Sequence, residues 1–485
     1  MKTFSGGNLT ISLEKPIFQT IVSERKNPTV MKFGGTSVRD AATFRRAAEI
    51  VAGERNNSPV VVTSAMAKVT DALLAAFETA KKDDFQAALD LLEPHFGRYF
   101  EVSRRLTEAE QQKNFELELE LSKKELGDLL ERVSRRSLPL SMLKDAIISY
   151  GEQLSSRLLT EVLKAKGLDA RHVDARRLIV TDDEYGAATP VWDETETLVR
   201  IELQPFIDAG EIPVLGGFIA ASNGGETTTL GRGGSDYSAA IIGAALRARE
   251  IQIWTDVTGV LTCDPRIVPE ARTLETLSYE EAAELAYFGA KVLHPKTIQP
   301  AVDFSIPVRV CNSHEPEKRG TMIMPRAETG AGRIKSIAHK TGITILRISS
   351  ARMLGAYGFM SALFQIFERY RTVIDVISTS EVAVSLTLDD TTSLEPIARE
   401  LKRLGAVEIE SNQAVVCIVG EGLRDTSGVA ALIFSTISDI NISLISQGAS
   451  SVNMTFVVKE EQVKEVIKRL HETFFQNKKN KNEFI

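Results

Sequence analysis

Residues 216–240 read GGFIAASNGGETTTLGRGGSDYSAA, and this stretch points most directly to a fold and a site. It is a glycine-rich loop, dense in hydroxyl side chains, that leads into a helical run at 238–246. Arg232 can bind a carboxylate through two parallel hydrogen bonds, and Asp236 can hold an ammonium group or orient a metal ion. A flexible linker does not need so many directional groups before a helix. The stretch therefore predicts a ligand-binding loop.

A second glycine-containing turn, KFGGTS at 32–37, ends the first predicted strand at 29–33. Its two glycines allow backbone N–H groups to approach phosphate oxygens, and a following helix N-terminus favours anions. Its Thr-Ser pair is expected to cap a helix at 39–51. Lys32 supplies a mobile cation. Taken alone, the pattern is as typical of a tight turn as of a phosphate site.

Two further segments follow the ligand-binding loop: WTDVTGVLTCDPR at 254–266 and FGAKVLHP at 288–295. The first is a predicted strand followed by turns, and the carboxyl end of a parallel strand is where such folds bind ligands. Arg266 and Lys291 are cations available for a nucleotide. Each of them alone is equally typical of a surface charge.

The remaining pattern indicates strands alternating with helices, which is typical of a mostly parallel sheet covered by helices on both faces. A long helical region is expected from residue 70 to about 166, interrupted near Pro94 and Pro139. Further strands are expected at 59–63, around Val173, and at 213–220, 251–255 and 307–310.

Beyond a polar segment at 326–330, the chain repeats itself with an offset of about 70 residues. Apolar runs at 343–348, 376–378 and 382–388 form the first copy with a helix around Phe364. Runs at 415–419, 444–446 and 454–458 form the second with a helix around Ile433. The sequence predicts two tandem βαββ units that share one core and expose strand edges suited to dimerisation.

Composition excludes several classes of protein. The chain has 485 residues, ordinary globular composition and a net charge of −7, without the basic block of a nucleic-acid or anionic-membrane binder. Three scattered cysteines, with no CxxC, favour a reducing cytosol over a disulfide framework or a zinc site. The first residues lack the hydrophobic core of a signal peptide. No P-loop, GxGxxG after a strand, HRD, DFG or HExxH motif occurs.

The four motifs, in this order and followed by a tandem repeat, resemble the aspartate kinases of the amino-acid-kinase fold, and the repeat resembles that family's pair of ACT domains. The resemblance covers about residues 29–475. It implies an N-terminal extension (1–28), a catalytic domain (29–325), a linker with the leading regulatory strand (326–341), two ACT domains (342–410 and 411–475) and a tail (476–485).

The resemblance also implies a reaction: ATP, with Mg²⁺, phosphorylates the β-carboxylate of L-aspartate to 4-phospho-L-aspartate, the first step toward lysine, threonine and methionine. Lys32 would hold the transferring phosphoryl group, and Arg232 and Asp236 would bind the α-carboxylate and the ammonium group of aspartate. The substrate set would also include Ser64, Thr70 and Glu152. The nucleotide set would be Lys32, Phe33, Gly34, Gly35, Thr255, Asp256, Leu261, Arg266 and Lys291.

Two positions depart from the family pattern. Leu261 stands where lysine-sensitive relatives often carry Tyr, and Tyr150 where some relatives carry His. Neither change removes a charged reacting group. The β-carboxylate of aspartate, with an ordinary pKa near 3.9, is already ionised at neutral pH, so no general base is needed. Catalysis would then depend on positioning and on cations that offset the charge of the transferred group, and no protein ligand is assigned to the metal.

The ACT pair implies feedback inhibition, and two acids that could meet the two ammonium groups of lysine favour L-lysine as the effector. These acids are Asp375 and Glu381. Ala356 replaces a serine that relatives often carry. The full effector set expected from the resemblance is Met353, Ala356, Gly358, Phe359, Met360, Asp375, Ser380 and Glu381. A homodimer or homotetramer through the ACT domains is expected.

Two alternatives remain open on the residues alone. One keeps the fold and replaces aspartate with glutamate, N-acetylglutamate or a nucleotide; an N-acetylated amine would leave Glu152 unpaired, at a cost of about 1–3 kcal/mol. The other is an amino-acid sensor with a silent kinase domain. Loss of Lys32 or Arg232 would have supported the sensor, but both are present.

Overall fold

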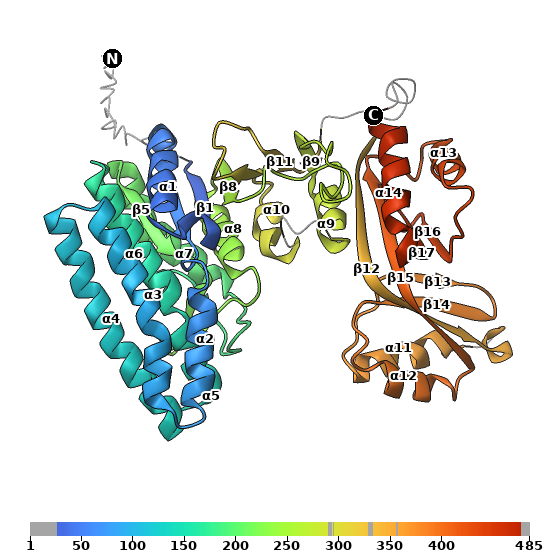
Figure 1. The fold of residues 1–485 in the computed structure, drawn as a ribbon, viewed down its shortest axis with the longest axis horizontal. Coiled ribbons are helices and arrows are strands. Elements are labelled where there is room, and N and C mark those ends of the chain that lie inside the picture. The colour runs from blue at the N-terminus through green and yellow to red at the C-terminus, as the bar shows by residue number, and fades with distance from the viewer. Residues whose placement is uncertain (1–26, 290–292, 294, 328–332, 356, 477–485) are drawn as a thin grey trace, which may run out of the picture.

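The computed structural model describes residues 27–289, 293, 295–327, 333–355 and 357–476. Figure 1 shows two parts, with the long strand β12 (Ile334–Ser349) lying between the first part and the rest of the second. The expected nucleotide residue Lys291, the expected effector residue Ala356 and most of the N-terminal extension and tail lie outside the described residues.

The first part is built on an eight-stranded sheet in the order β3-β5-β2-β1-β8-β10-β11-β9, parallel except between β10 and β11. This confirms the expected mostly parallel sheet. Its strands are β1 (Thr29–Phe33), β2 (Pro59–Thr63), β3 (Ala170–His172), β5 (Ile212–Gly216), β8 (Glu250–Thr255), β9 (Thr276–Ser278), β10 (Val308–Asn312) and β11 (Thr321–Met324). A small second sheet contains β4 (Val180–Thr181), β6 (Ile219–Ser222) and β7 (Thr227–Thr229).

Helices cover both faces of the large sheet. Side chains alternate between the two faces along a strand, and every residue of β1, β2 and β5 is therefore buried. Met31 and Phe33 of β1 pack with the first group of helices, whereas Val30 packs with the second. The first group is α1 (Ala41–Gly53), α2 (Val69–Ala80), α3 (Phe85–Leu106), α4 (Ala109–Arg135), α5 (Leu140–Ile148) and α6 (Tyr150–Ala165). The second is α7 (Trp192–Ala209), α8 (Gly234–Leu246), α9 (Tyr279–Tyr287) and α10 (Gln299–Asp303).

Three local predictions were wrong. Helix α1 is capped by Asp40, which forms a capping box with Thr43, while the Thr-Ser pair lies in a 3-10 turn at Gly35–Val38. Pro94 lies inside α3 without interrupting it. The strand expected at 213–220 is two strands, β5 and β6, separated at Phe218, whose backbone has a positive φ of 66°.

The second part is a six-stranded sheet in the order β13-β14-β12-β15-β17-β16. The expected repeat is present, and each unit carries one helix more than the βαββ pattern predicts. The strands are β12, β13 (Ile377–Thr379), β14 (Ala383–Leu388), β15 (Ala406–Gly420), β16 (Leu444–Gln447) and β17 (Asn453–Lys459). The helices are α11 (Phe359–Arg369), α12 (Leu394–Leu401), α13 (Val429–Thr436) and α14 (Val463–His471).

The two units share this sheet, and one of its faces forms a common core that contains Ile345 of the first unit and Val457 of the second, as predicted, whereas the helices on the other face pack in two separate clusters. Helices α11 and α12 pack with Leu346 and Val384 in one cluster, and α13 and α14 pack with Val416 and Phe456 in another. The second cluster also contains Cys263, Ile267 and Val268, which follow β8 in the first part. Since the two long strands β12 and β15 run through both units, the sheet is common and the helical layers are separate.

The two parts are joined by further buried contacts around α9. Leu285 and Phe288 pack in one cluster with Ile343 and Val415 of the second sheet. Lys335 of β12 forms a buried 2.7 Å ion pair with Glu281 of α9. No helix within the described ranges is long and apolar enough to cross a membrane.

Candidate active site

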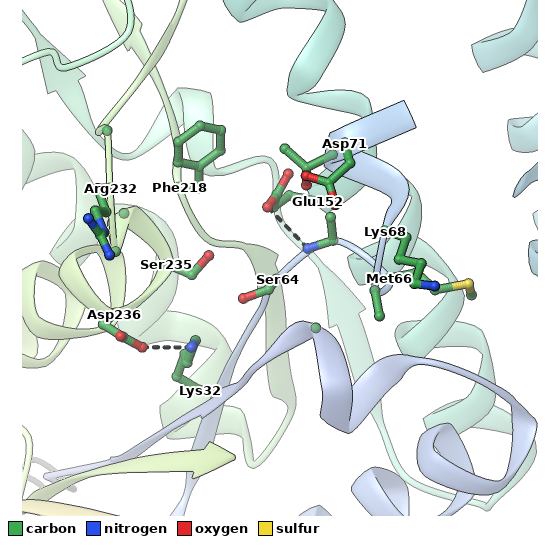
Figure 2. A pocket seen from close by; sticks show the side chains of 17 residues that line it. Lys32, Ser64, Met66, Lys68, Asp71, Glu152, Phe218, Arg232, Ser235 and Asp236 are labelled. Atoms are coloured by element: carbon green, nitrogen blue, oxygen red, sulfur yellow. Dashed lines mark hydrogen bonds and ion pairs between the residues drawn. The ribbon is translucent and has the colours of Figure 1, made fainter. Parts of the chain in front are cut away.

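A pocket of about 430 Å³ opens at the carboxyl ends of the central strands β1, β2 and β5 (Figure 2). This is the end at which parallel α/β sheets bind ligands. Arg232, Ser235 and Asp236 lie on one side, and Glu152, Lys68 and Asp71 on the other. The lining comprises Lys32, Gly35, residues 64–68, Thr70, Asp71, Glu152, Phe218 and residues 231–236.

Lys32, the cation at the end of β1, is paired inside the pocket. Its Nζ lies 2.6 Å from Asp236 Oδ1, and both side chains are largely buried. Asp236 occupies the first turn of α8, where the helix dipole favours a negative charge. The pair brings together two residues that are about 200 positions apart in the sequence, as the predicted site requires.

Glu152, in the first turn of α6, is a buried carboxyl with spare hydrogen-bonding capacity. Its Oε1 accepts a 3.1 Å hydrogen bond from the Ala65 N–H, and Oε2 has no partner among the described residues. Burial raises the pKa of this carboxyl to about 8, although the Ala65 N–H and the charge of Lys32 oppose the shift. A cationic ligand group beside Oε2 would satisfy the free oxygen and favour the ionised form.

Glycines let the loop of residues 216–240 fold tightly behind the pocket. A Cβ on Gly217 would lie 2.8 Å from the Cα of Ser235, so a larger residue would push β5 away from α8. Gly233, at φ 73°, precedes α8 in a left-handed conformation that L side chains rarely adopt. Close packing therefore requires a glycine at position 217, and the backbone conformation favours one at position 233.

Asp145 of α5 holds the same loop from behind. Its Oδ2 accepts hydrogen bonds of 2.8 Å from the N–H groups of Gly186 and Thr229, and burial raises the pKa of this carboxyl. Arg232 lies at the exposed rim of the pocket. Arg232 therefore lines the pocket from a loop whose base is held by Asp145.

Of the predicted nucleotide residues that the structure describes, Lys32 and Gly35 line the pocket, and Phe33, Gly34, Thr255 and Asp256 lie beside it. The Gly34 N–H donates to the Trp254 carbonyl, which places the end of β8, with Thr255 and Asp256, next to the KFGG turn. Phe33 stacks on Trp254 with ring centroids 6.1 Å apart. These residues thus form a second region that adjoins the pocket at Lys32 and Gly35.

Two residues of the expected nucleotide set lie farther along the segment after β8. The Leu261 carbonyl accepts a 2.8 Å hydrogen bond from Ser336 of β12. Arg266 has an 85% exposed side chain that pairs with Asp264 at 2.7 Å. The pair holds the pKa of the Asp264 carboxyl below its ordinary value.

The predicted effector residues that the structure describes belong to the first regulatory unit. Met353, Phe359 and Met360 are half-buried against its apolar cluster, and Gly358 begins α11 in a left-handed conformation. Ser380 accepts hydrogen bonds from nearby backbone N–H groups, and Glu381 is exposed.

Asp375, in contrast, is already engaged. Its side chain is 2% exposed, and its Oδ1 accepts a 2.6 Å hydrogen bond from Tyr287 Oη of α9. Lys340 Nζ lies 3.4 Å from the same oxygen and 2.5 Å from Asp389.

Ten of the seventeen lining residues were not predicted, and four of these ten carry polar or aromatic side chains: Lys68, Asp71, Phe218 and Ser235. Phe218 and Ser235 lie within the stretch 216–240, and Lys68 and Asp71 lie close in sequence to the expected Thr70; this proximity was the available signal. The direction of the Phe218 side chain could not be predicted from it, because the backbone of this residue has a positive φ.

Together, the parallel sheet, the lysine-glycine turn, the pocket and the paired regulatory units define a small-molecule kinase with an attached ligand-sensing module. The family model of the amino acid kinases matches residues 27–312, and an ACT domain model matches residues 416–474. The first match covers more than half of the chain.

Two proteins of similar sequence indicate which family within this class the chain belongs to. The chain is 36% identical over 455 residues to lysine-sensitive aspartokinase 3 of Escherichia coli, covering 92% of this chain and 99% of the relative. It is 35% identical to chloroplastic aspartokinase 1 of Arabidopsis thaliana, covering 94% and 82%. The chain belongs to the aspartokinase family.

Comparison with solved structures supports the same family. The crystal structure of E. coli aspartokinase III in complex with aspartate and ADP (R-state) matches with a TM-score of 0.77 at 36% identity, covering 92% of this chain and all of that one. The same enzyme with lysine and aspartate (T-state) matches with a TM-score of 0.78, covering 92% and 99%.

Proposed function

We propose that this chain transfers the γ-phosphoryl group of ATP to the β-carboxylate of L-aspartate, releasing ADP and 4-phospho-L-aspartate. The observation that carries the proposal is one pocket lined by Arg232, which can bind an anion, by Glu152, which can bind a cation, and by Lys32, a largely buried cation paired with Asp236. A free α-amino acid fits this set of charges. The family and the titles of the related structures, which name aspartate and ADP, support it.

In this proposal Arg232 binds the α-carboxylate of aspartate, and Glu152, with Asp236 nearby, binds the ammonium group. Ser64 and Thr70, which follow β2, help to seat the substrate. The β-carboxylate then points toward Lys32, where the small residues of the KFGG turn leave room for phosphate oxygens. Since an ionised carboxylate needs no deprotonation, attack on the γ-phosphorus requires alignment and charge stabilisation rather than a general base.

The nucleotide would lie along the end of β8, bound by Phe33, Gly34, Gly35, Thr255, Asp256, Leu261, Arg266 and Lys291. No group of three or more candidate metal ligands occurs among the described residues. Mg²⁺ commonly uses one or two carboxylates and the oxygens of substrate phosphates, so the site fits a metal that arrives with ATP. Asp236 and Asp256 are the nearby carboxylates that could orient it, and the ion would offset phosphate charge.

We propose L-lysine as the effector, acting through the residues Met353, Ala356, Gly358, Phe359, Met360, Asp375, Ser380 and Glu381. The acids Asp375 and Glu381 support a ligand with two ammonium groups. The related T-state structure, whose title names lysine, supports the same choice. The outer strands β13 and β16 expose the apolar side chains of Ile377 and Ile445, which supports a homodimer or homotetramer through the second part.

We also propose the domain division derived from the sequence: 1–28, 29–325, 326–341, 342–410, 411–475 and 476–485. The eight-stranded sheet within 29–324 and the six-stranded sheet within 334–459 support it. A reducing compartment, the cytoplasm, is proposed as the location, and the three free, buried cysteines support it.

The deciding experiment is ADP formation from Mg·ATP with L-aspartate, compared with L-glutamate and N-acetyl-L-glutamate, with and without L-lysine or L-threonine. Aspartate-dependent turnover that lysine suppresses supports both halves of the proposal. Aspartate-dependent turnover that threonine suppresses and lysine does not would overturn the proposal that L-lysine is the effector. Lysine binding without turnover on any acceptor would overturn the kinase and favour a sensor.

A further inference from the structure

Arg98 of α3 is the residue that ties two walls of the pocket together. Its Nη1 donates a 2.9 Å hydrogen bond to the carbonyl of Ala67, and its Nη2 donates a 2.9 Å hydrogen bond to the carbonyl of Arg39. Ala67 belongs to the turn after β2, which lines the pocket where Ser64 and Thr70 are proposed to seat aspartate, the phosphoryl acceptor. We call this turn the acceptor-side turn, and the turn after β1 the phosphate-side turn. Arg39 ends the turn after β1, which carries Gly35.

These two turns are in direct contact at the pocket. A Cβ on Gly35 would lie only 2.9 Å from the carbonyl oxygen of Ala65. A small shift of either turn would therefore change the separation of the phosphate side from the acceptor side. Arg98 does not line the pocket, so its influence on a reaction there passes through the backbone it holds.

The acceptor-side turn needs support, because its backbone is unusual. Lys68 has a left-handed φ of 69°, which a residue with a side chain rarely adopts, and Arg98 binds the carbonyl immediately before it. The planar guanidinium presents several N–H donors in a fixed fork and can serve two carbonyls at once. A lysine ammonium at this position would be a flexible point donor.

The next residue on α3 supports the same turn from its other side. Tyr99 Oη donates to the carbonyl of Gly151 and lies 3.1 Å from Ser155 Oγ, which in turn accepts a 2.8 Å hydrogen bond from the Met66 N–H. Gly151 precedes Glu152, the proposed ammonium ligand. Helix α3 thus holds the acceptor-side turn through both Arg98 and Tyr99.

We propose that Arg98 is a positioning residue for phosphoryl transfer, fixing the phosphate-side turn against the acceptor-side turn. The inference rests on the proposed function, because it assigns the two turns to the two substrates. In-line transfer depends steeply on the separation of the reacting atoms, and a misplacement of about 1 Å costs about 100-fold in rate. Loss of Arg98 should therefore lower kcat more than it weakens nucleotide binding.

The test compares Arg98→Ala and Arg98→Lys with Arg105→Met, a control on the same helix whose exposed guanidinium pairs with Glu101. For each variant, kcat, both KM values, the equilibrium Kd of ADP and the thermal midpoint are measured. We expect kcat to fall at least 10-fold in Arg98→Ala, with the Kd of ADP within two-fold. Millimolar ethylguanidinium should restore part of kcat in Arg98→Ala and have no effect on Arg105→Met.

Unchanged kcat and KM in Arg98→Ala would overturn the inference. So would a loss of kcat that follows the thermal midpoint and does not respond to ethylguanidinium. Arg98→Lys keeps the charge and tests the fork geometry if the alanine variant does not fold; wild-type kcat in it would equally overturn the proposal. Absence of aspartate-dependent turnover in the wild type would instead refute the proposed function.

Discussion

Lys32 Nζ and Asp236 Oδ1 lie 2.6 Å apart at the bottom of the pocket, so the proposed phosphate-binding cation is held by the first turn of α8. The pairing fixes the ammonium at the end of β1 before a nucleotide arrives. An electrostatic group placed in advance of the reaction avoids reorganisation when charge develops. The proposed reaction depends on this arrangement.

Replacing Lys32 with Met should lower kcat about 100- to 1000-fold, the usual cost of losing one preorganised charge-stabilising donor. Steady-state kinetics of ADP formation measures the effect. The Kd of aspartate should stay within a few-fold, since Arg232 and Glu152 are untouched. A kcat within three-fold of wild type would show that Lys32 does not act on the transferred group.

Replacing Glu152 with Gln should raise the KM of aspartate about 10- to 100-fold at pH 8.5, because an ammonium group loses its charged partner. The pKa of Glu152 is raised to about 8 by burial, so below pH 8 the empty pocket holds the protonated form. Aspartate binding must then displace that proton, and the wild-type KM should rise as the pH falls from 8.5 to 6.5.

The Gln variant should lose this pH dependence. A matched control is Glu161→Gln, on the same helix, whose carboxylate pairs with Lys164. That variant should keep the wild-type pH profile of KM. An identical profile in wild type and Glu152→Gln would contradict the role of this carboxyl.

Replacing Lys335 with Met should destabilise the protein by about 3–5 kcal/mol, because it leaves Glu281 buried without its cation. The two side chains are 7% and 1% exposed, and Glu281 Oε2 also caps α9 at the Ser278 N–H. Denaturant unfolding measures the change. The surface variant Lys318→Met, which removes a partner of Glu315, should change stability by less than about 1 kcal/mol.

Replacing Tyr287 with Phe should make the proposed lysine inhibition several-fold more sensitive. Tyr287 Oη donates a hydrogen bond to Asp375 Oδ1, and burial together with this hydrogen bond raises the pKa of the Tyr287 phenol. An effector ammonium that binds Asp375 must compete with this hydroxyl, so its removal should lower the lysine concentration for half-inhibition. Asp375→Asn should raise it.

The control is Tyr370→Phe, which removes a hydroxyl bound to Glu400 within the same regulatory unit. It should leave the inhibition curve unchanged. Equal sensitivity of Tyr287→Phe and wild type to lysine would show that this contact does not oppose the effector.

Local sequence predicted most of the parallel sheet, because buried strands such as Thr29–Phe33 and Pro59–Thr63 are short runs rich in valine and other apolar residues, which favour a buried strand. It failed where tertiary packing outweighs local preference. Pro94 removes one backbone donor from α3, yet Leu92 and Phe96 on either side are buried in the core, so the helix continues.

For the site, the motifs predicted residues whose role is set by charge, such as Lys32, Arg232 and Glu152, and the pocket contains all three. They could not predict partners from distant segments. The contact between Tyr287 and Asp375 joins residues 88 positions apart, and no local pattern marks either as its partner. The support of Ala67 by Arg98 was missed for the same reason.

The burial of Cys263, Ile267 and Val268 within the apolar cluster of α13 and α14 has a consequence for protein engineering. A regulatory half from another enzyme could not be exchanged as an independent cassette at the chain connection near residue 330. The segment after β8 would then meet foreign side chains, so a working chimera would have to exchange that segment together with the helices it packs against.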